Sequence, residues 1–71
     1  MSDGAVSVRV NGEPRELAAG TTVEALVAEL GLKPGRFAVE IDGVVVPKSE
    51  HGERRLAGGE ALEIVTFVGG G

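Results

Sequence analysis

The sequence predicts an α+β domain in which one helix covers one face of a β-sheet. Three features indicate this class: segments with apolar residues at period two, one segment with apolar residues at helical spacing, and glycine-containing pairs between segments. In chain order they form two strands, a helix, further strands and a final strand, within 71 residues. A single short helix shields only one face, so we expect the other face to be solvated or used for binding.

The first segment, AVSVRVNGEPREL, predicts a β-hairpin. Val6, Val8 and Val10 alternate with polar residues before the pair Asn11-Gly12. Asn and Gly tolerate the positive φ angles that a type I′ turn requires. The two flanking strands should therefore pair with the valines on the buried face.

The next segment, AAGTTVEALVAELGLKPG, predicts an amphipathic helix over about residues 22–30. Its apolar residues follow the spacing i, i+3, i+4 and i+7: Val23, Leu26, Val27 and Leu30. Thr21 and Glu24 have the spacing of a capping box at the start. Gly31 suits the left-handed residue that follows a helix, and Pro34 lies beyond it.

Strand patterns return in RFAVEIDGVVVPK. Apolar residues alternate over 37–41, the pair Asp42-Gly43 marks a turn, and the valines 44–46 end at Pro47. The polar segment 48–55 then predicts a loop or one irregular turn. We expect its one histidine, His51, to be a surface residue without a catalytic or metal-binding role, because no cysteine or second histidine accompanies it.

The final strand is expected over 61–67, after a turn at Gly58-Gly59. Leu62 and Ile64 share one parity along it. Glu63, Val65 and Phe67 share the other, and a glutamate is a poor core residue. We therefore expect Val65 and Phe67 to face outward as an apolar patch for a protein partner, the alternative being that Phe67 packs under a loop.

Composition excludes several classes of function. Eleven acidic and seven basic residues give a net charge of −4, and only Arg54 and Arg55 adjoin, which argues against nucleic-acid binding. The absence of cysteine excludes disulfides, zinc thiolates and thiol catalysis by this chain. No apolar run is long enough to span a membrane, and no leader pattern is visible, so we expect a cytoplasmic protein.

With these classes excluded, the chemical group left to consider is the carboxylate of Gly71, the last residue of the segment VTFVGGG that follows from the final strand. An idle tail and a cloning remnant are the simpler interpretations. However, three residues without Cβ atoms span about 10 Å and fit a narrow channel, where a partner could activate that carboxylate. The acyl-adenylate, made with ATP and Mg²⁺ held by the partner, is the expected activated form.

These residues resemble the ThiS family of sulfur carriers in thiamin biosynthesis. The resemblance runs from about Val6 to Gly71 and includes VNGE, TTVEALVAELGL, IDGVVVPKSE and above all GEALEIVTFVGGG. It implies a ubiquitin-like β-grasp fold, a mixed sheet of four to five strands on one main helix, in which the first and last strands form a central parallel pair. Residues 69–71 would form a flexible glycine tail on a single domain spanning 1–71.

The resemblance also implies a chemistry, in which the chain is a co-substrate and not an enzyme. A ThiF-type adenylyltransferase would adenylate Gly71 of the Gly70-Gly71 pair, with ATP and Mg²⁺ bound by that partner and no cofactor bound by this chain. Sulfur from a cysteine desulfurase would replace the adenylate to give a thiocarboxylate. A ThiG-type thiazole synthase would accept the sulfur. Gly69, Phe67 and Val65 are the residues we expect to contact these partners.

Three other interpretations remain open at this stage. Molybdopterin-type sulfur carriers share the fold, the diglycine end and the activation, but tend to be longer than 71 residues. A ubiquitin-like modifier would join its activated glycine to lysine amines of other proteins. A passive ubiquitin-like binding module would not use the tail at all.

Overall fold

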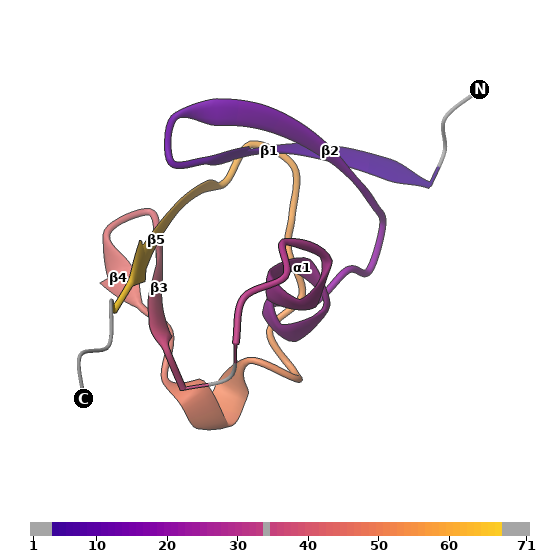
Figure 1. The fold of residues 1–71 in the computed structure, drawn as a ribbon. Coiled ribbons are helices and arrows are strands. Elements are labelled where there is room, and N and C mark those ends of the chain that lie inside the picture. The colour runs from indigo at the N-terminus through magenta and orange to yellow at the C-terminus, as the bar shows by residue number, and fades with distance from the viewer. Residues whose placement is uncertain (1–3, 34, 68–71) are drawn as a thin grey trace.

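The strands and helices follow the predicted order. A computed structural model describes residues 4–33 and 35–67 (Figure 1). Within these residues the chain forms five strands, one α-helix and one short 3-10 helix. In order they are β1 (Ala5–Val10), β2 (Glu13–Ala18), α1 (Val23–Glu29), β3 (Phe37–Ile41), β4 (Val44–Val45), η1 (Lys48–Glu50) and β5 (Ala61–Thr66).

The strands form one mixed sheet with the order β2-β1-β5-β3-β4. The first and last strands, β1 and β5, are parallel neighbours, whereas β1 with β2, β3 with β5 and β3 with β4 are antiparallel. The helix α1 lies against one face of this twisted sheet (Figure 1). The predicted α+β class and the ubiquitin-like β-grasp arrangement are confirmed.

Both hairpin turns have the backbone that their sequences predict. Asn11 and Gly12 have φ angles of 51° and 87°, and Asp42 and Gly43 have 51° and 85°. Positive φ at both central residues is the requirement of a type I′ turn, whose twist matches that of the flanking strands. The two turns therefore set the registers Val10↔Glu13 and Ile41↔Val44.

The start of α1 differs from the prediction by one residue. The N-cap is Thr22, whose hydroxyl accepts a hydrogen bond from the Ala25 N–H at 3.1 Å. The capping box expected for Thr21 and Glu24 is wrong, because Thr22 is still extended and the third helical residue is Ala25. The Thr21 hydroxyl instead donates to the Ala18 carbonyl at 2.6 Å, within the turn that leads into the helix.

The end of α1 is a Schellman motif. Gly31 has a φ angle of 77°, and its N–H donates to the Ala28 carbonyl at 3.0 Å. The Leu32 N–H donates to the Val27 carbonyl at 3.1 Å, which gives the paired bonds of that motif. The role predicted for Gly31 is confirmed, whereas Pro34 lies outside the described residues.

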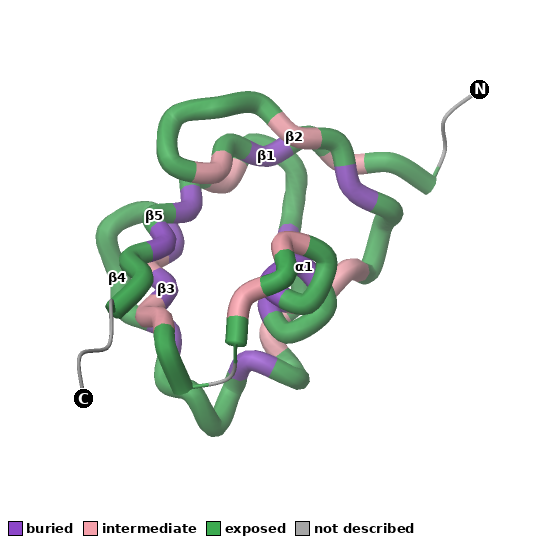
Figure 2. Tube along the Cα trace, in the orientation of Figure 1, coloured by how far each residue is buried: buried purple, intermediate pink, exposed green. Residues whose placement is uncertain are grey.

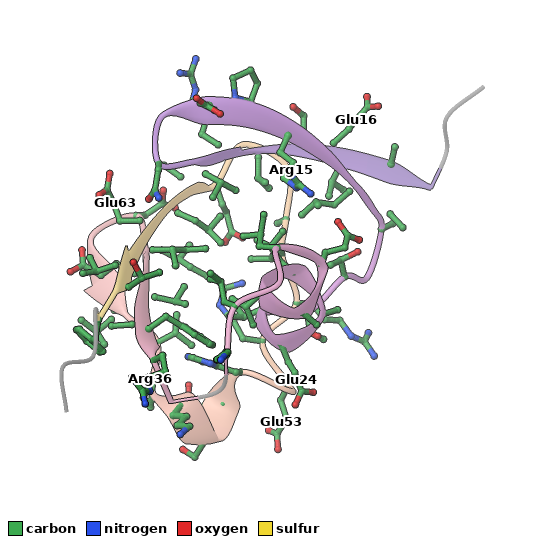
Figure 3. The ribbon with its side chains drawn as sticks, viewed as in Figure 1. Arg15, Glu16, Glu24, Arg36, Glu53 and Glu63 are labelled. Atoms are coloured by element: carbon green, nitrogen blue, oxygen red, sulfur yellow. The ribbon has the colours of Figure 1, made fainter. Side chains whose placement is uncertain are left out.

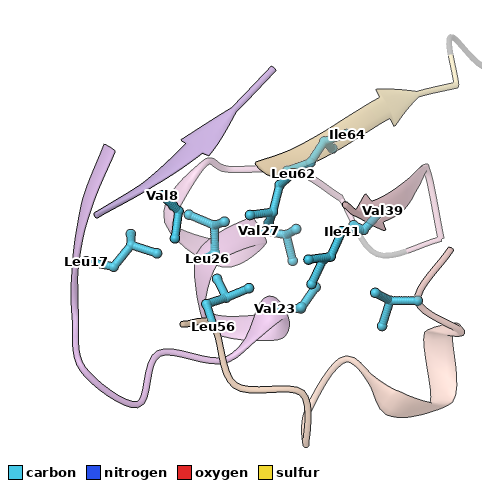
Figure 4. Packing of buried hydrophobic residues seen from close by; sticks show 11 residues of the cluster. Val8, Leu17, Val23, Leu26, Val27, Val39, Ile41, Leu56, Leu62 and Ile64 are labelled. Carbon is cyan, nitrogen blue, oxygen red and sulfur yellow. The ribbon is translucent and has the colours of Figure 1, made fainter. Parts of the chain in front are cut away.

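The core lies between α1 and the sheet face that it covers (Figures 2 and 4). It includes the predicted helical stripe and alternate residues of four strands. Its buried side chains are Val8, Leu17, Val23, Leu26, Val27, Val39, Ile41, Val46, Leu56, Leu62 and Ile64. Val6, Val10 and Leu30 are partly buried against this core, so the valines of β1 face inward as predicted.

His51 is buried, so the prediction of a surface histidine is wrong. Its side chain is 7% exposed and stacks on Phe37, with 5.8 Å between ring centroids. Nε2 lies 3.0 Å from the Val46 carbonyl, and because a carbonyl only accepts, Nε2 donates this hydrogen bond. The irregular turn predicted for 48–55 is confirmed as η1, and His51 follows directly after it with its imidazole turned inward.

Candidate functional site

The exposed end of β5 is the region from which the glycine tail continues. Val65 is 53% exposed and Phe67 is 54% exposed, whereas Leu62 and Ile64 are buried at 1% and 8%. The predicted outward parity of Val65 and Phe67 is therefore confirmed, and the alternative in which Phe67 packs under a loop is wrong. Figure 2 shows the change from buried to exposed residues along this strand.

Neighbouring strands extend this apolar surface on the sheet face away from α1. Val65 lies opposite Ala38 in β3, and Glu40 of β3 lies opposite Val45 in β4, which is itself exposed. The Phe67 N–H donates to the Arg36 carbonyl at 2.8 Å, which holds Phe67 in line with the sheet. We call the set Ala38, Val45, Val65 and Phe67 the open-face patch.

Two carboxylates border the open-face patch. Glu40 and Glu63 are directly opposite each other in the register of β3 and β5, on the same face as Val65 (Figure 3 labels Glu63). Like charges in directly opposed positions destabilise a sheet. Among the described residues, ion pairs join Arg15 to Glu29 and Arg54 to Glu60, but none involves these two carboxylates. The patch is thus suited to a partner surface that is apolar with a basic border.

The turn residues Asn11 and Asp42 hold β5 through their side chains. Asn11 Oδ1 accepts from the Ile64 N–H at 2.7 Å, and Asn11 Nδ2 donates to the Ile64 carbonyl at 3.2 Å. Asp42 Oδ1 accepts from the Ala61 N–H at 3.1 Å. The sequence predicts only a turn for both residues, because a contact with a strand 19 or 53 residues away leaves no local pattern.

The start of β5 is held by Glu60. Its carboxylate accepts from Arg54 Nη2 at 2.7 Å and from the Ala57 N–H at 2.8 Å. Burial raises the pKa of Glu60, but the hydrogen bonds from Arg54 and Ala57 and the positive charge of Arg54 outweigh burial, and the net pKa lies below its ordinary value. Glu60 is therefore held as a carboxylate at neutral pH, beside the first residue of the strand.

The glycines to which the sequence assigns the chemistry, Gly69, Gly70 and Gly71, lie outside the described residues. In the described part of the chain, no three His, Asp or Glu side chains are grouped as a metal site would require. Nor does that part contain a helix with the length and apolar character needed to cross a membrane.

Comparison with known proteins identifies the relatives of this chain. The model of the ThiS family matches residues 8–71. A crystal structure of the thiamine biosynthesis protein ThiS from Geobacter metallireducens superimposes with a TM-score of 0.77 and 28% identity, over 93% of this chain and all of that one. The fold and the family match thus agree over nearly the same residues.

Curated relatives include longer proteins. A thiazole synthase of Paramagnetospirillum magneticum is 47% identical over 62 residues, and one of Magnetococcus marinus is 39% identical over 66. The chain spans 19% and 20% of their lengths. An uncharacterized protein, ycf40, of Pyropia yezoensis is 30% identical over 93% of both chains. The chain belongs to the ThiS family, whose members are small sulfur carrier proteins.

Proposed function

We propose that this chain carries sulfur for thiazole formation in thiamin biosynthesis, as a thiocarboxylate at Gly71. The observation that carries the proposal is the family match, which continues through the glycine tail to Gly71. The ThiS structure and the two thiazole synthases support the thiazole pathway over the molybdopterin pathway. The exposed end of β5 supports a role in which the tail enters a partner.

The proposed chemistry has two steps. The Gly71 carboxylate attacks the α-phosphorus of ATP, which a ThiF-type adenylyltransferase holds with Mg²⁺, and pyrophosphate leaves. The resulting acyl-adenylate has a good leaving group, which the carboxylate lacks. The outer sulfur of the persulfide that a desulfurase forms from cysteine then bonds to the acyl carbon as AMP leaves, and a thiol reduces the S–S bond of the resulting acyl disulfide to give the thiocarboxylate. A ThiG-type thiazole synthase receives this sulfur.

The described residues contribute docking rather than chemistry in this proposal. The open-face patch would contact the partner while Gly69 and Gly70 place the reacting carbonyl in its channel without side-chain obstruction. The opposed Glu40 and Glu63 would meet basic side chains at the border of that contact. ATP and Mg²⁺ would be held by the adenylyltransferase, and this chain would bind no cofactor of its own.

Intact-protein mass spectrometry tests the proposal. The chain is incubated with a ThiF-type adenylyltransferase, ATP, Mg²⁺, a cysteine desulfurase, cysteine and a thiol reductant. We expect a mass gain equal to the replacement of one oxygen by sulfur. The control variant lacks Gly71, and it should show no gain while its thermal midpoint stays unchanged. No gain in the full chain would contradict the carrier role, and conjugation to lysines of other proteins would favour a modifier.

A further inference from the structure

One edge of β5 has no strand partner at its exposed end. The Asn11 N–H donates to the Leu62 carbonyl at 2.8 Å, and the Asn11 side chain binds both backbone groups of Ile64. The backbone groups of alternate residues in a strand point to the same side. The N–H and C=O of Thr66 therefore point toward the side of β5 on which β1 lies. However, β1 ends opposite Leu62, where the chain turns into β2, and no described residue pairs with Thr66 on that side.

The opposite edge of the same segment is occupied. The Phe67 N–H donates to the Arg36 carbonyl, and Val65 lies opposite Ala38 in the hydrogen-bonded register of β3 and β5. The side chains of Val65 and Phe67 are about half exposed on the open face. The end of β5 is thus free along one edge and one face, and unpaired edges of this kind readily accept an added strand.

A groove runs beside this free edge. Its volume is about 470 Å³, and it lies between the β1–β2 hairpin, the end of α1 and β5. Leu30, Leu32 and Ile64 supply apolar surface, and Pro14, Arg15 and Thr66 lie along its sides. Asn11, Glu13, Arg15 and Thr66 add polar groups to its lining, so the groove presents both apolar and hydrogen-bonding surface to a ligand.

Arg15 supplies an unsatisfied donor at the groove. It lies opposite Val8, on the sheet face toward α1, and Figure 3 shows it between β2 and α1. Its Nη2 donates to Glu29 at 3.3 Å, but its Nε is buried and has no hydrogen-bond acceptor in the part of the chain that the structure describes. A buried donor without an acceptor costs free energy. The Arg15 side chain as a whole is 40% exposed, so its accessible N–H groups are within reach of an acceptor on a bound segment.

We propose that an extended segment of the thiazole synthase adds to the sheet along the Thr66 edge of β5 and fills this groove. Its backbone would pair with the N–H and C=O of Thr66, in the manner of β-strand addition. An apolar side chain would lie on Leu30 and Leu32, and a carbonyl or carboxylate oxygen would accept from the exposed part of the Arg15 guanidinium. This inference rests on the proposed function, because it assumes that the thiazole synthase receives sulfur from this chain and describes how the two proteins bind each other.

Two observations favour this occupant over a second copy of the chain. The free edge adjoins the open-face patch at the same end of β5, so one partner can cover both beside the tail. Each copy of the chain carries a net charge of −4, which opposes self-association. A partner segment with alternating apolar residues can contact the apolar lining of the groove and accept a hydrogen bond from Arg15 without that repulsion.

Amide hydrogen exchange by NMR tests the strand addition. The ¹⁵N-labelled chain is measured alone and with unlabelled thiazole synthase from the same genome. We expect at least tenfold slower exchange of the Thr66 amide in the complex, with Val65 and Phe67, already paired with β3, as references. Unchanged exchange at Thr66 in a saturated complex would overturn the proposal. Protection that appears at high concentration without the synthase would also overturn it, in favour of a second copy.

Affinity measurements on variants provide an independent test. Thr66→Pro removes the free N–H without removing a bond to β3, and Arg15→Met removes the groove donor. Each should weaken binding to the synthase at least fivefold. Glu29→Gln is the control, since it breaks the ion pair with Arg15 outside the groove, and it should bind within twofold of the native chain. Native-like binding by Arg15→Met and a folded Thr66→Pro would overturn the proposal.

The thiocarboxylate assay separates the two levels of failure. If the unaltered chain gains no sulfur, the proposed function fails. If it gains sulfur and binds the synthase, but Thr66 stays unprotected and the variants bind normally, the strand addition alone is wrong.

Discussion

The two halves of the segment 61–67, which contains β5, have opposite surroundings although they are continuous in the chain. The first half, 61–64, pairs with β3 along its length and with β1 at residues 61 and 62, and it buries Leu62 and Ile64. The Asn11 and Asp42 side chains also hold it. The second half, from Val65 on, pairs with β3 alone and is exposed. Buried packing and hydrogen bonding are thus concentrated in the first half, whereas the second half is accessible from solvent.

The largest expected effect is a loss of stability from Leu62→Ala. Leu62 is almost fully buried against the helix (Figure 4), so the change removes apolar contacts and leaves a cavity. We expect the free energy of unfolding to fall by about 2–5 kcal/mol, measured by urea denaturation. Val65→Ala is the matched change in the exposed half, and it should cost less than about 0.5 kcal/mol. Equal losses in the free energy of unfolding for the two variants would show that the two halves contribute equally to stability.

The side-chain anchors of β5 are compared with Asn11→Gly and Asp42→Gly. Glycine keeps the positive φ of each turn, so the variants differ mainly in lost bonds to β5: two for Asn11 and one for Asp42. We expect Asn11→Gly to lower the free energy of unfolding by about 2 kcal/mol and Asp42→Gly by about 1 kcal/mol, by denaturant titration. A reversed order would mean that the Asn11 bonds to Ile64 contribute little.

The exposed half is tested with Phe67→Glu. The new carboxylate would place a charge in the open-face patch, while the native Phe67 contributes little to the core. We expect binding to the adenylyltransferase or the thiazole synthase to weaken at least tenfold, which is about 1.4 kcal/mol, by calorimetry. The thermal midpoint should stay within about 2 °C, in line with a small surface effect. Unfolding of this variant would place Phe67 in the core.

The smallest expected effect concerns pH and Glu60. Because its pKa is lower in the folded chain than its ordinary value of 4.5, its carboxylate stabilises the fold above that pH. This stabilisation is lost as the pH falls through the folded pKa. Glu60→Gln should cost about 1 kcal/mol at neutral pH, or about 4–8 °C in thermal midpoint, since Arg54 is partly exposed to solvent. If the loss of stability caused by Glu60→Gln stayed the same from neutral pH down to pH 3, the charge of the Glu60 carboxylate would be excluded as its cause.

Local patterns predicted most of the secondary structure correctly because they depend on neighbours in the chain. The turn at Asn11-Gly12, the helical stripe and Gly31 require only backbone preference and periodicity. The N-cap was displaced by one residue because Thr21 and Thr22 are equally suitable caps, and the bond from Thr21 to Ala18 decided between them.

Long-range packing accounts for what the sequence analysis missed. His51 lies in a polar segment, and its burial depends on two contacts from elsewhere in the fold: the ring of Phe37 and the carbonyl of Val46. The anchoring by Asn11 and Asp42, the opposed Glu40 and Glu63, and the free edge at Thr66 all depend on which strands are neighbours in the sheet. Strand order leaves no signature in the residues of any one strand.

The amino-acid sequence alone thus specified the α+β class, the hairpin, the helix and the outward parity of Val65 and Phe67, because period and turn chemistry are local properties. The tertiary structure alone decided that β5 lies between β1 and β3 in the sheet. It also decided that the pairing of β1 with β5 stops at Leu62, so that it does not reach Thr66. Pairing partners are set by burial of the shared core, to which residues far apart in sequence contribute together. That pairing divides β5 into an anchored half and an accessible one.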